Sequence, residues 1–307
     1  MLKRALQEFA RKLAPEKIAP EYGFSFELVT SLKQRPRVPR SVDINIHNYC
    51  TAKCDMCPMP SLGRKLEKGV MPFSLFERIV DQIVAAGRPT VTFCQNGDVF
   101  ALPNSIDYLR HACARGLDMY LVTNSAMLNR EKVDALVEMG FAGKLYVSFH
   151  GIRKATYEKT MGLPFERTLA SVNYLLERGL KVQFIRALTH NFEPGEQEEA
   201  ERYWNRRGVA VTFAPPHSWS GTVREQPPVK ETIKGCIQPL NQLCIDFNGD
   251  VYLCCIDLMK QVVVGNAKET PLLDIWNGER YLSVVRALFD NSLPQDHMCR
   301  KCHAAMV

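Results

Sequence analysis

The sequence lacks the segments that would carry it into or across a membrane. No stretch approaches the roughly 18–20 consecutive apolar residues of a membrane-spanning helix. The first residues, Met-Leu-Lys-Arg-Ala-Leu-Gln, lack the apolar centre of a secretory signal. No dense run of lysine and arginine is present, and the net charge of +6 over 307 residues is mild. We therefore expect a cytoplasmic protein with no membrane span and no nucleic-acid partner.

Internal repeats and low-complexity tracts are missing as well. An apolar content of 46% and a charged content of 23% are typical of an ordinary globular protein. The length is sufficient for one large domain with a small appendage.

Cysteine is the residue type that the sequence has in excess. Its eleven cysteines are an odd number in a chain without an export signal, so closely spaced ones indicate metal ligands rather than a disulfide framework. Seven of the eleven fall into two such sets. The others stand in apolar contexts that predict buried free thiols: Cys94, Cys113, Cys244 and Cys255.

Residues 1–40 read as a short lead-in. Apolar residues at helical spacing between Leu2 and Leu13 predict a helix that packs on its own domain, with contact to a membrane surface as the alternative. Prolines between positions 15 and 39 predict an irregular segment after it.

Residues 41–215 alternate between short apolar runs and amphipathic stretches. The predicted strands are Val42–Ile46, Thr90–Phe93, Asp118–Val122, Lys144–Phe149, Lys181–Ile185 and Val209–Phe213. The predicted helices are Ser74–Ala86, Asn104–Arg115, Asn129–Met139, Phe165–Arg178 and Gln197–Arg207. Such a series predicts an α/β fold with a parallel sheet and crossover helices. It is too short for a closed eight-fold barrel, so we expect an open or partial barrel.

Ligand sites in such sheets lie at the carboxyl ends of the strands. Several chemically useful residues stand at or just beyond those predicted ends. They are Cys50, Asn96-Gly97-Asp98, Thr123-Asn124, Ser148 and Arg186. Their agreement in position indicates one common site.

Residues 216–307 have a different character. A linker rich in serine, glycine and proline is followed by a predicted hairpin of Gln242–Phe247 and Asp250–Leu253 with a turn at Asn248-Gly249. Val262–Val264 predicts a further strand and Tyr281–Phe289 a helix. We expect this segment to form a small C-terminal domain.

The sharpest motif is C-x3-C-x2-C, formed by Cys50, Cys54 and Cys57 directly after the first predicted strand. Three thiolates on one loop can bind three corners of a cubane iron–sulfur cluster and leave one iron open for another ligand. A zinc site that includes His47, or three unrelated thiols, are the alternatives. Zinc sites usually pair cysteines as two C-x2-C units, so the motif favours the cluster.

The second set of cysteines is Cys236, Cys254, Cys299 and Cys302. Cys236 and Cys254 flank the predicted hairpin, and Cys299 and Cys302 form a C-x2-C pair near residue 307. Four converging thiolates suit either a closed [4Fe–4S] cluster or a structural zinc, and spacing does not decide between them.

A C-x3-C-x2-C loop after the first strand of a βα-repeat domain resembles the radical S-adenosylmethionine (SAM) enzymes. The resemblance implies a partial (β/α)6 barrel and SAM bound to the open iron through its amino and carboxylate groups. It also implies that an electron, from a flavodoxin- or ferredoxin-type donor, cleaves SAM to methionine and a 5′-deoxyadenosyl radical. That radical abstracts a hydrogen atom from the substrate.

The resemblance assigns further SAM contacts residue by residue. Met56 stands where the family usually has an aromatic residue near the adenine. Asn96-Gly97-Asp98 aligns with the family's Gly-Gly-Glu, which binds the SAM amino group; an ordinary turn is the alternative. Thr123-Asn124 follows the third predicted strand, as in many relatives, and Ser148 ends the fourth, where family members often contact SAM; a strand-end hydroxyl or cap is the alternative for each. Arg186 would meet the SAM carboxylate, with a surface ion pair as the alternative.

The stretch from Cys254-Cys255-Ile-Asp through Gly265-Asn266 to Leu273-Asp-Ile-Trp276-Asn resembles the SPASM/twitch extensions of radical SAM enzymes. That resemblance favours one auxiliary [4Fe–4S] cluster on the second cysteine set, in a small β-hairpin-plus-helix twitch domain. Cys255, next to a cluster ligand on a predicted strand, should point to the opposite face from Cys254.

The leading hypothesis is a radical SAM dehydrogenase that oxidises a sugar- or aminocyclitol-type small molecule, with the auxiliary cluster as electron acceptor. An epimerase in which Cys255 donates a hydrogen atom is the first alternative. A peptide-modifying enzyme is the second, although the N-terminal forty residues are short for a peptide-recognition domain. A non-catalytic zinc scaffold and a nucleic-acid-modifying role are the remaining alternatives.

Overall fold

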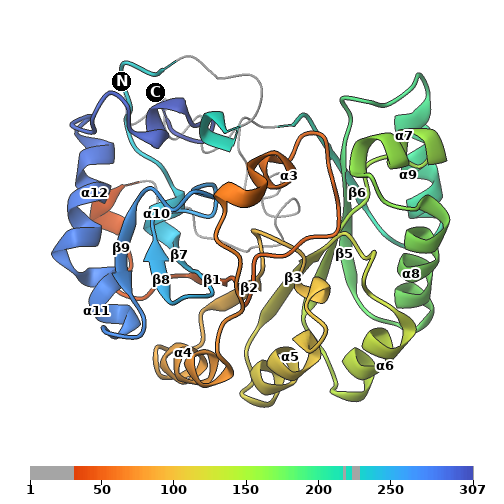
Figure 1. Cartoon of the computed structure of the whole chain (residues 1–307), viewed down its shortest axis with the longest axis horizontal. Helices are drawn as coiled ribbons and strands as arrows, with labels where there is room; N and C mark the ends of the chain where they lie inside the picture. The colour runs from red at the N-terminus through yellow and green to blue at the C-terminus, as the bar shows by residue number, and fades with distance from the viewer. Residues whose placement is uncertain (1–30, 217–218, 223–228, 307) are drawn as a thin grey trace.

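The computed structural model describes residues 31–216, 219–222 and 229–306 (Figure 1). The helix predicted between Leu2 and Leu13 lies outside these residues. The strands form a nine-stranded sheet in the order β6-β5-β4-β3-β2-β1-β7-β8-β9. In the described part of the chain, no helix is long and apolar enough to span a membrane.

The first six strands form the predicted parallel sheet, with each strand hydrogen-bonded to the next in sequence. They are β1 (Ser41–Ile44), β2 (Thr90–Phe93), β3 (Met119–Thr123), β4 (Lys144–Ser148), β5 (Val182–Leu188) and β6 (Val211–Ala214). The intervening helices are α3 (Pro58–Leu62), α4 (Phe73–Ala85), α5 (Ser105–Ala114), α6 (Arg130–Glu138), α7 (Lys154–Met161), α8 (Phe165–Glu177) and α9 (Glu196–Asn205). Figure 1 shows α4, α5, α6 and α8 along the outside of the curved sheet, as a partial barrel requires.

The C-terminal segment continues this sheet beyond β1. After the short α10 (Gln238–Asn241), strand β7 (Gln242–Ile245) pairs in parallel with β1, so that Asp43 faces Cys244 across the ladder. Strands β8 (Asp250–Tyr252) and β9 (Val263–Asn266) then extend the sheet with antiparallel pairing, and β9 forms its edge. Helices α11 (Leu272–Asn277) and α12 (Glu279–Phe289) complete the segment. The predicted hairpin is confirmed, and it is joined to the barrel by backbone hydrogen bonds.

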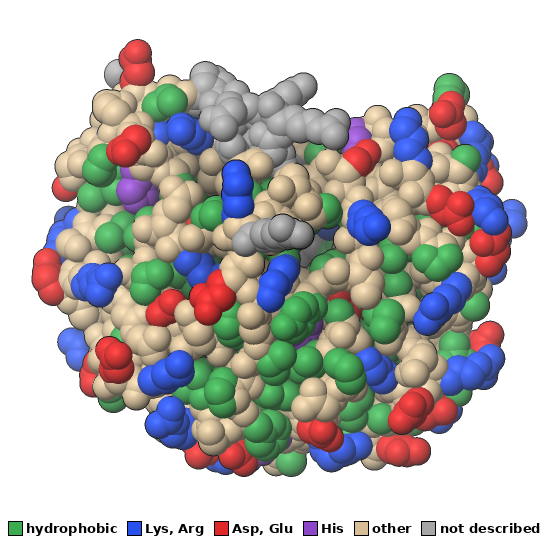
Figure 2. Space-filling view, in the orientation of Figure 1, with side chains coloured by type: hydrophobic (Ala, Val, Ile, Leu, Met, Phe, Trp, Pro, Cys, Tyr) green, Lys and Arg blue, Asp and Glu red, His purple; other side chains and the backbone are tan. Residues whose placement is uncertain are grey.

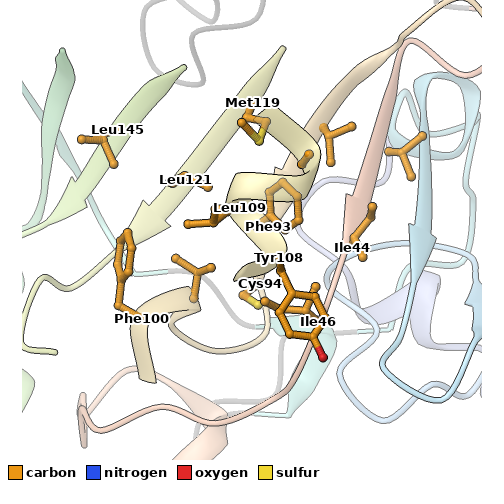
Figure 3. Close-up of a cluster of buried hydrophobic side chains, with 14 of the residues drawn as sticks. Ile44, Ile46, Phe93, Cys94, Phe100, Tyr108, Leu109, Met119, Leu121 and Leu145 are labelled. Atoms are coloured by element: carbon orange, nitrogen blue, oxygen red, sulfur yellow. The ribbon is translucent and has the colours of Figure 1, made fainter. Parts of the chain in front are cut away.

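The core lies between the sheet and its outer helices. On α4, apolar residues at helical spacing, such as Phe76 and Ile79, are fully buried. They belong to the same cluster as Ile44 and Phe93 on the strands, part of which Figure 3 shows. Because side chains alternate along a strand, Asp43 points to the opposite, inner face of the sheet from Ile44. The inner face is therefore where polar groups gather.

The main difference between the predicted and the observed helices is that several observed helices were not predicted. Helix α7 was not predicted, because its buried face includes the polar residues Thr156 and Thr160 and so gives no apolar stripe. The short helices α3, α10 and α11 were also not predicted. Strand β2 has its predicted bounds, and the other predicted strands shift by one to three residues at their ends.

Candidate functional site

The C-x3-C-x2-C loop lies between β1 and α3 and brings its cysteines to one cavity of about 220 Å³. Burial is the main reason why the pKa of the Cys50 thiol rises to about 12. Burial, followed by repulsion from Cys57 and Cys50, raises the pKa of the Cys54 thiol as well. Thiols placed this closely ionise readily only when a cation binds between them. The donor set therefore fits an iron–sulfur cluster.

Backbone and side-chain contacts hold this loop from two directions. The backbone N–H groups of Lys53 and Asp55 donate to the carbonyls of Met161 and Thr160, at 2.9 and 3.0 Å, near the end of α7. The Asp55 carboxylate pairs with Nε2 of His190 at 2.8 Å and accepts from Asn191 Nδ2 at 2.7 Å, just beyond β5. The loop is therefore fixed by the opposite side of the barrel.

Most of the residues predicted as SAM contacts line the same cavity. It is bordered by Cys50, Cys54, Cys57, Met56, Asn96, Gly97, Thr123, Asn124, Ser148 and Arg186. They come from the carboxyl ends of β1 through β5, as a parallel sheet predicts. Residues as far apart in the sequence as Cys50 and Arg186 thus share one site.

Asp98 is the exception among them, because it is not one of the residues that line the cavity. Its carboxylate is buried and accepts hydrogen bonds from Phe100 N at 3.0 Å, Thr123 Oγ1 at 2.9 Å and Asn124 N at 2.6 Å. Burial raises its pKa, and the bond from Asn124 N is the largest influence that opposes this rise. Asp98 therefore orders the end of β3 in this structure.

Gly97 has a steric role in the same turn. A Cβ atom at this position would lie 2.7 Å from the carbonyl oxygen of Tyr49, which is too close for any side chain. Asp98 N donates to that same carbonyl at 2.9 Å. The glycine thus lets the turn after β2 approach the residue that precedes Cys50.

The second cysteine set forms a separate buried centre. The thiols of Cys236, Cys254, Cys299 and Cys302 surround a small cavity whose other walls are apolar. Burial raises the pKa of the Cys236 and Cys299 thiols, and repulsion from the neighbouring thiols raises them further. Four thiols around one small apolar cavity fit a closed iron–sulfur cluster.

Two family models match the chain in these same regions. The first, described as the radical SAM superfamily, matches residues 44–203, which include the first cysteine loop and strands β2 to β5. This chain belongs to the radical SAM superfamily. The second, an iron–sulfur cluster-binding domain named SPASM, matches residues 236–303 and includes the second cysteine set. The protein is therefore a radical SAM enzyme that uses a [4Fe–4S] cluster and SAM, with an auxiliary cluster domain.

Curated relatives of this radical SAM enzyme are distant. The SAM-dependent 2-deoxy-scyllo-inosamine dehydrogenase of Niallia circulans is 21% identical over 275 residues, which cover 87% of this chain and 93% of the relative. The AdoMet-dependent heme synthase of Methanosarcina barkeri is 25% identical over 175 residues, covering 54% of this chain and 49% of that protein. These identities leave the substrate open.

Solved structures confirm the fold. BtrN in complex with AdoMet and 2-DOIA aligns with a TM-score of 0.61 at 16% identity, over 87% of this chain and 93% of that one. Streptococcus suis SuiB, bound to its precursor peptide SuiA, aligns with a TM-score of 0.69 at 16% identity, over 98% and 83%. The same architecture therefore serves proteins with small-molecule and with peptide ligands.

Sequence reasoning missed His150, which lines the radical SAM cavity just beyond β4. Its Nδ1 accepts the backbone N–H of Leu188 at 3.2 Å, so the neutral ring carries its proton on Nε2. Burial, and then repulsion from Arg186, lowers its pKa to about 4. His150 is thus a neutral hydrogen-bond donor at physiological pH, two positions after Ser148.

The position of Cys255 differs from the prediction. Strand β8 ends at Tyr252, so Cys254 and Cys255 stand in the following turn, where strand alternation does not apply. A hydrogen bond between the two thiols and their burial raise the pKa of Cys254, so the thiols lie together rather than on opposite faces. Cys255 is not among the described residues that line either cavity.

The surface gives no sign of a large charged interface on the face that Figure 2 shows. Lys and Arg side chains are scattered there among Asp and Glu, and apolar side chains gather near the lower centre. This mixture is typical of a globular surface and contrasts with the basic stripe of nucleic-acid-binding proteins.

Proposed function

We propose that this radical SAM enzyme is a dehydrogenase that oxidises a small hydroxylated or amino-substituted ring, of the sugar or aminocyclitol type. The buried, apolar centre of Cys236, Cys254, Cys299 and Cys302 carries the proposal, since it offers a cluster with no open ligand position. Such a closed cluster suits electron acceptance. The match to a dehydrogenase over 93% of its length supports the small-molecule class.

The residues that line the cavity have different roles. In this proposal Cys50, Cys54 and Cys57 hold the SAM-binding [4Fe–4S] cluster, and Arg186 meets the SAM carboxylate. When bound, the cluster and SAM supply the radical that removes a hydrogen atom from the substrate. Six other lining residues orient SAM: Met56, Asn96, Gly97, Thr123, Asn124 and Ser148.

Completing a dehydrogenation requires the substrate to lose one further electron and one proton. In this proposal one auxiliary [4Fe–4S] cluster is the electron acceptor. The epimerase alternative needs a thiol that reaches the substrate. Cys255 is next to Cys254 and does not line the SAM cavity, which favours the dehydrogenase.

The test begins with anaerobic purification and reconstitution. Two cubanes predict about eight irons and eight sulfides per chain, whereas Cys236→Ser should retain about four of each. Cys113→Ser is the matched control, because that half-buried thiol belongs to neither set and should leave the iron content unchanged.

Activity is then assayed with dithionite, SAM and 2-deoxy-scyllo-inosamine, together with a panel of related cyclitols and one peptide. The proposal expects 5′-deoxyadenosine and a ketone product in equal amounts from a cyclitol, detected by liquid chromatography and mass spectrometry. An epimerised cyclitol or a modified peptide instead would contradict it. A zinc content with no sulfide would contradict both cluster assignments.

A further inference from the structure

The hydroxyl of Tyr252 links the strand that precedes Cys254 to a residue of the SAM cavity. Tyr252 is the last residue of β8, two positions before the predicted auxiliary ligand Cys254, and it is fully buried. Its hydroxyl oxygen accepts hydrogen bonds from Asn45 Nδ2 at 2.8 Å and from Asn96 Nδ2 at 3.0 Å. Asn96 lies 156 positions earlier in the sequence and lines the SAM cavity.

A third hydrogen bond closes this arrangement into a triangle. The backbone N–H of Asn96 donates to Asn45 Oδ1 at 3.3 Å, which fixes the Asn45 amide with its nitrogen towards Tyr252. All three residues are buried. The triangle therefore joins the end of β1, the turn after β2 and the end of β8 at one point.

The Asn96 side chain is left with one unused group. Its Nδ2 is occupied by Tyr252, while its Oδ1 is buried and has no hydrogen-bond partner among the described residues. An unpaired buried amide oxygen costs free energy, of the order of 1–3 kcal/mol, unless a ligand supplies a donor. Asn96 lines the cavity, and the carboxylate of Asp98 is already engaged elsewhere.

We propose that Tyr252 is a positioning residue that holds the Asn96 amide with its oxygen towards the SAM cavity, ready to accept a hydrogen bond from an amine N–H group. SAM carries such an amine, so in the proposed function Tyr252 makes SAM affinity depend on the segment that carries the auxiliary centre. The inference rests on the SAM assignment of this cavity. It does not depend on which substrate is oxidised.

Tyr252→Phe tests the inference, because it removes the hydroxyl and keeps the ring. SAM affinity is measured anaerobically on the fully reconstituted enzyme by calorimetry, and independently by the change in the cluster's paramagnetic resonance spectrum when SAM is added. One hydrogen bond of ordinary strength predicts a rise in the SAM dissociation constant of about five- to ten-fold. Iron and sulfide contents should match those of the unaltered enzyme.

Tyr281→Phe is the matched control. Tyr281 is equally buried, and its hydroxyl donates to carbonyls in the same C-terminal segment, to Pro239 O at 3.0 Å with Gln242 O at 3.3 Å. Neither Tyr281 nor these two partners are among the described residues that line the SAM cavity, so this variant should bind SAM as the unaltered enzyme does. Equal weakening in both variants would mean that Tyr252 acts only through general stability and would overturn the proposal.

A double-mutant cycle identifies the route. If Tyr252 acts through Asn96, then adding Tyr252→Phe to Asn96→Ala should cause no further loss of SAM affinity. Independent, additive losses would overturn the proposal, as would normal affinity in Tyr252→Phe. If Tyr252→Phe does not fold, Asn45→Ala removes the two hydrogen bonds that Asn45 makes in the triangle. Unchanged SAM affinity in Asn45→Ala would also overturn the proposal.

SAM binding is measured without substrate, so this test keeps its meaning if the enzyme proves to act on a peptide. Loss of the dehydrogenase proposal would leave the role of Tyr252 standing. Conversely, normal SAM binding in Tyr252→Phe would leave the reaction type untouched.

Discussion

The side-chain amide of Asn124 donates a hydrogen bond to Sγ of Cys50 across 3.5 Å. Its orientation is set by two neighbours, since Asn124 N donates to Asp98 Oδ2 at 2.6 Å and Asn124 Oδ1 accepts from Ala126 N at 2.9 Å. Hydrogen bonds to ligand sulfurs are among the factors that set the reduction potential of an iron–sulfur cluster, because they stabilise the more negative, reduced state.

Asn124→Ala should therefore make the midpoint potential of the SAM-binding cluster more negative. The measurement is a redox titration of the reconstituted enzyme followed by paramagnetic resonance, with the auxiliary cluster removed by Cys236→Ser to isolate one signal. Asn104→Ala, at an exposed position with no side-chain cap bond, is the control and should not move the potential. An unchanged potential in Asn124→Ala would show that the contact has no electrostatic effect.

Asp98→Asn should destabilise the end of β3. The carboxylate accepts bonds from Thr123 Oγ1 and from Asn124 N, and an amide nitrogen in place of Oδ2 cannot accept them. We expect a loss of about 1–3 kcal/mol in the free energy of unfolding, measured by anaerobic urea titration. A variant of normal stability that fails to bind SAM would instead indicate direct contact between Asp98 and the ligand.

Cys255→Ala should leave the oxidised product and its rate close to those of the unaltered enzyme, since this thiol does not line the SAM cavity. The neighbouring Cys254→Ala is the informative partner, because it should lose the auxiliary iron. Analysis of the products after single and multiple turnovers distinguishes the effects of Cys255→Ala from those of Cys254→Ala. Loss of an epimerised product in Cys255→Ala, with an oxidised compound in its place, would establish the hydrogen-donor role.

Acidification should destabilise the protein through His150. Its pKa is lowered to about 4 in the folded state, against about 6.5 in an unfolded chain. Between these values the unfolded chain binds a proton that the folded protein does not, so the free energy of unfolding falls as pH decreases, by up to about 1.4 kcal/mol per pH unit. Above pH 6.5 this contribution is constant.

His150→Gln has no titrating ring at this position. Its free energy of unfolding should therefore decrease less steeply between about pH 6.5 and 4. His47 has the same lowered pKa of about 4 for the same main reason, burial, so part of the decrease should remain. Urea unfolding of the apoprotein at several pH values measures the slopes. An identical slope in the variant would contradict the assignment of a neutral, buried His150.

The barrel was predictable because its signals are local. The apolar run Thr90–Phe93 is bounded by polar and turn residues, and the Asn248-Gly249 pair marks the hairpin directly. The cavity followed from one geometric rule, that parallel strands end on the same side, which brought Cys50, Asn124 and Arg186 together.

The remaining features depend on contacts between distant segments. Asp98 stands at the predicted position, yet its hydrogen bonds with Thr123 and Asn124 turn its carboxylate away from the cavity. No local sequence pattern predicts these hydrogen bonds. Likewise, Cys255 follows a strand that ends earlier than its apolar pattern indicates. The triangle of Asn45, Asn96 and Tyr252 joins three segments that are distant in the sequence and has no local signature.

The pairing of β1 with β7 sets the order in which the molecule can be completed as it leaves the ribosome. Ser41 pairs with Gln242, so the strand that precedes the first cysteine loop gains one of its neighbours about 200 residues later in synthesis. Translation adds about 5–20 residues each second, and so distant a pairing also slows folding. Until β7 emerges, β1 is an unprotected sheet edge, open to pairing with other nascent chains. The C-terminal segment thus also protects the edge of β1 once it has been synthesised.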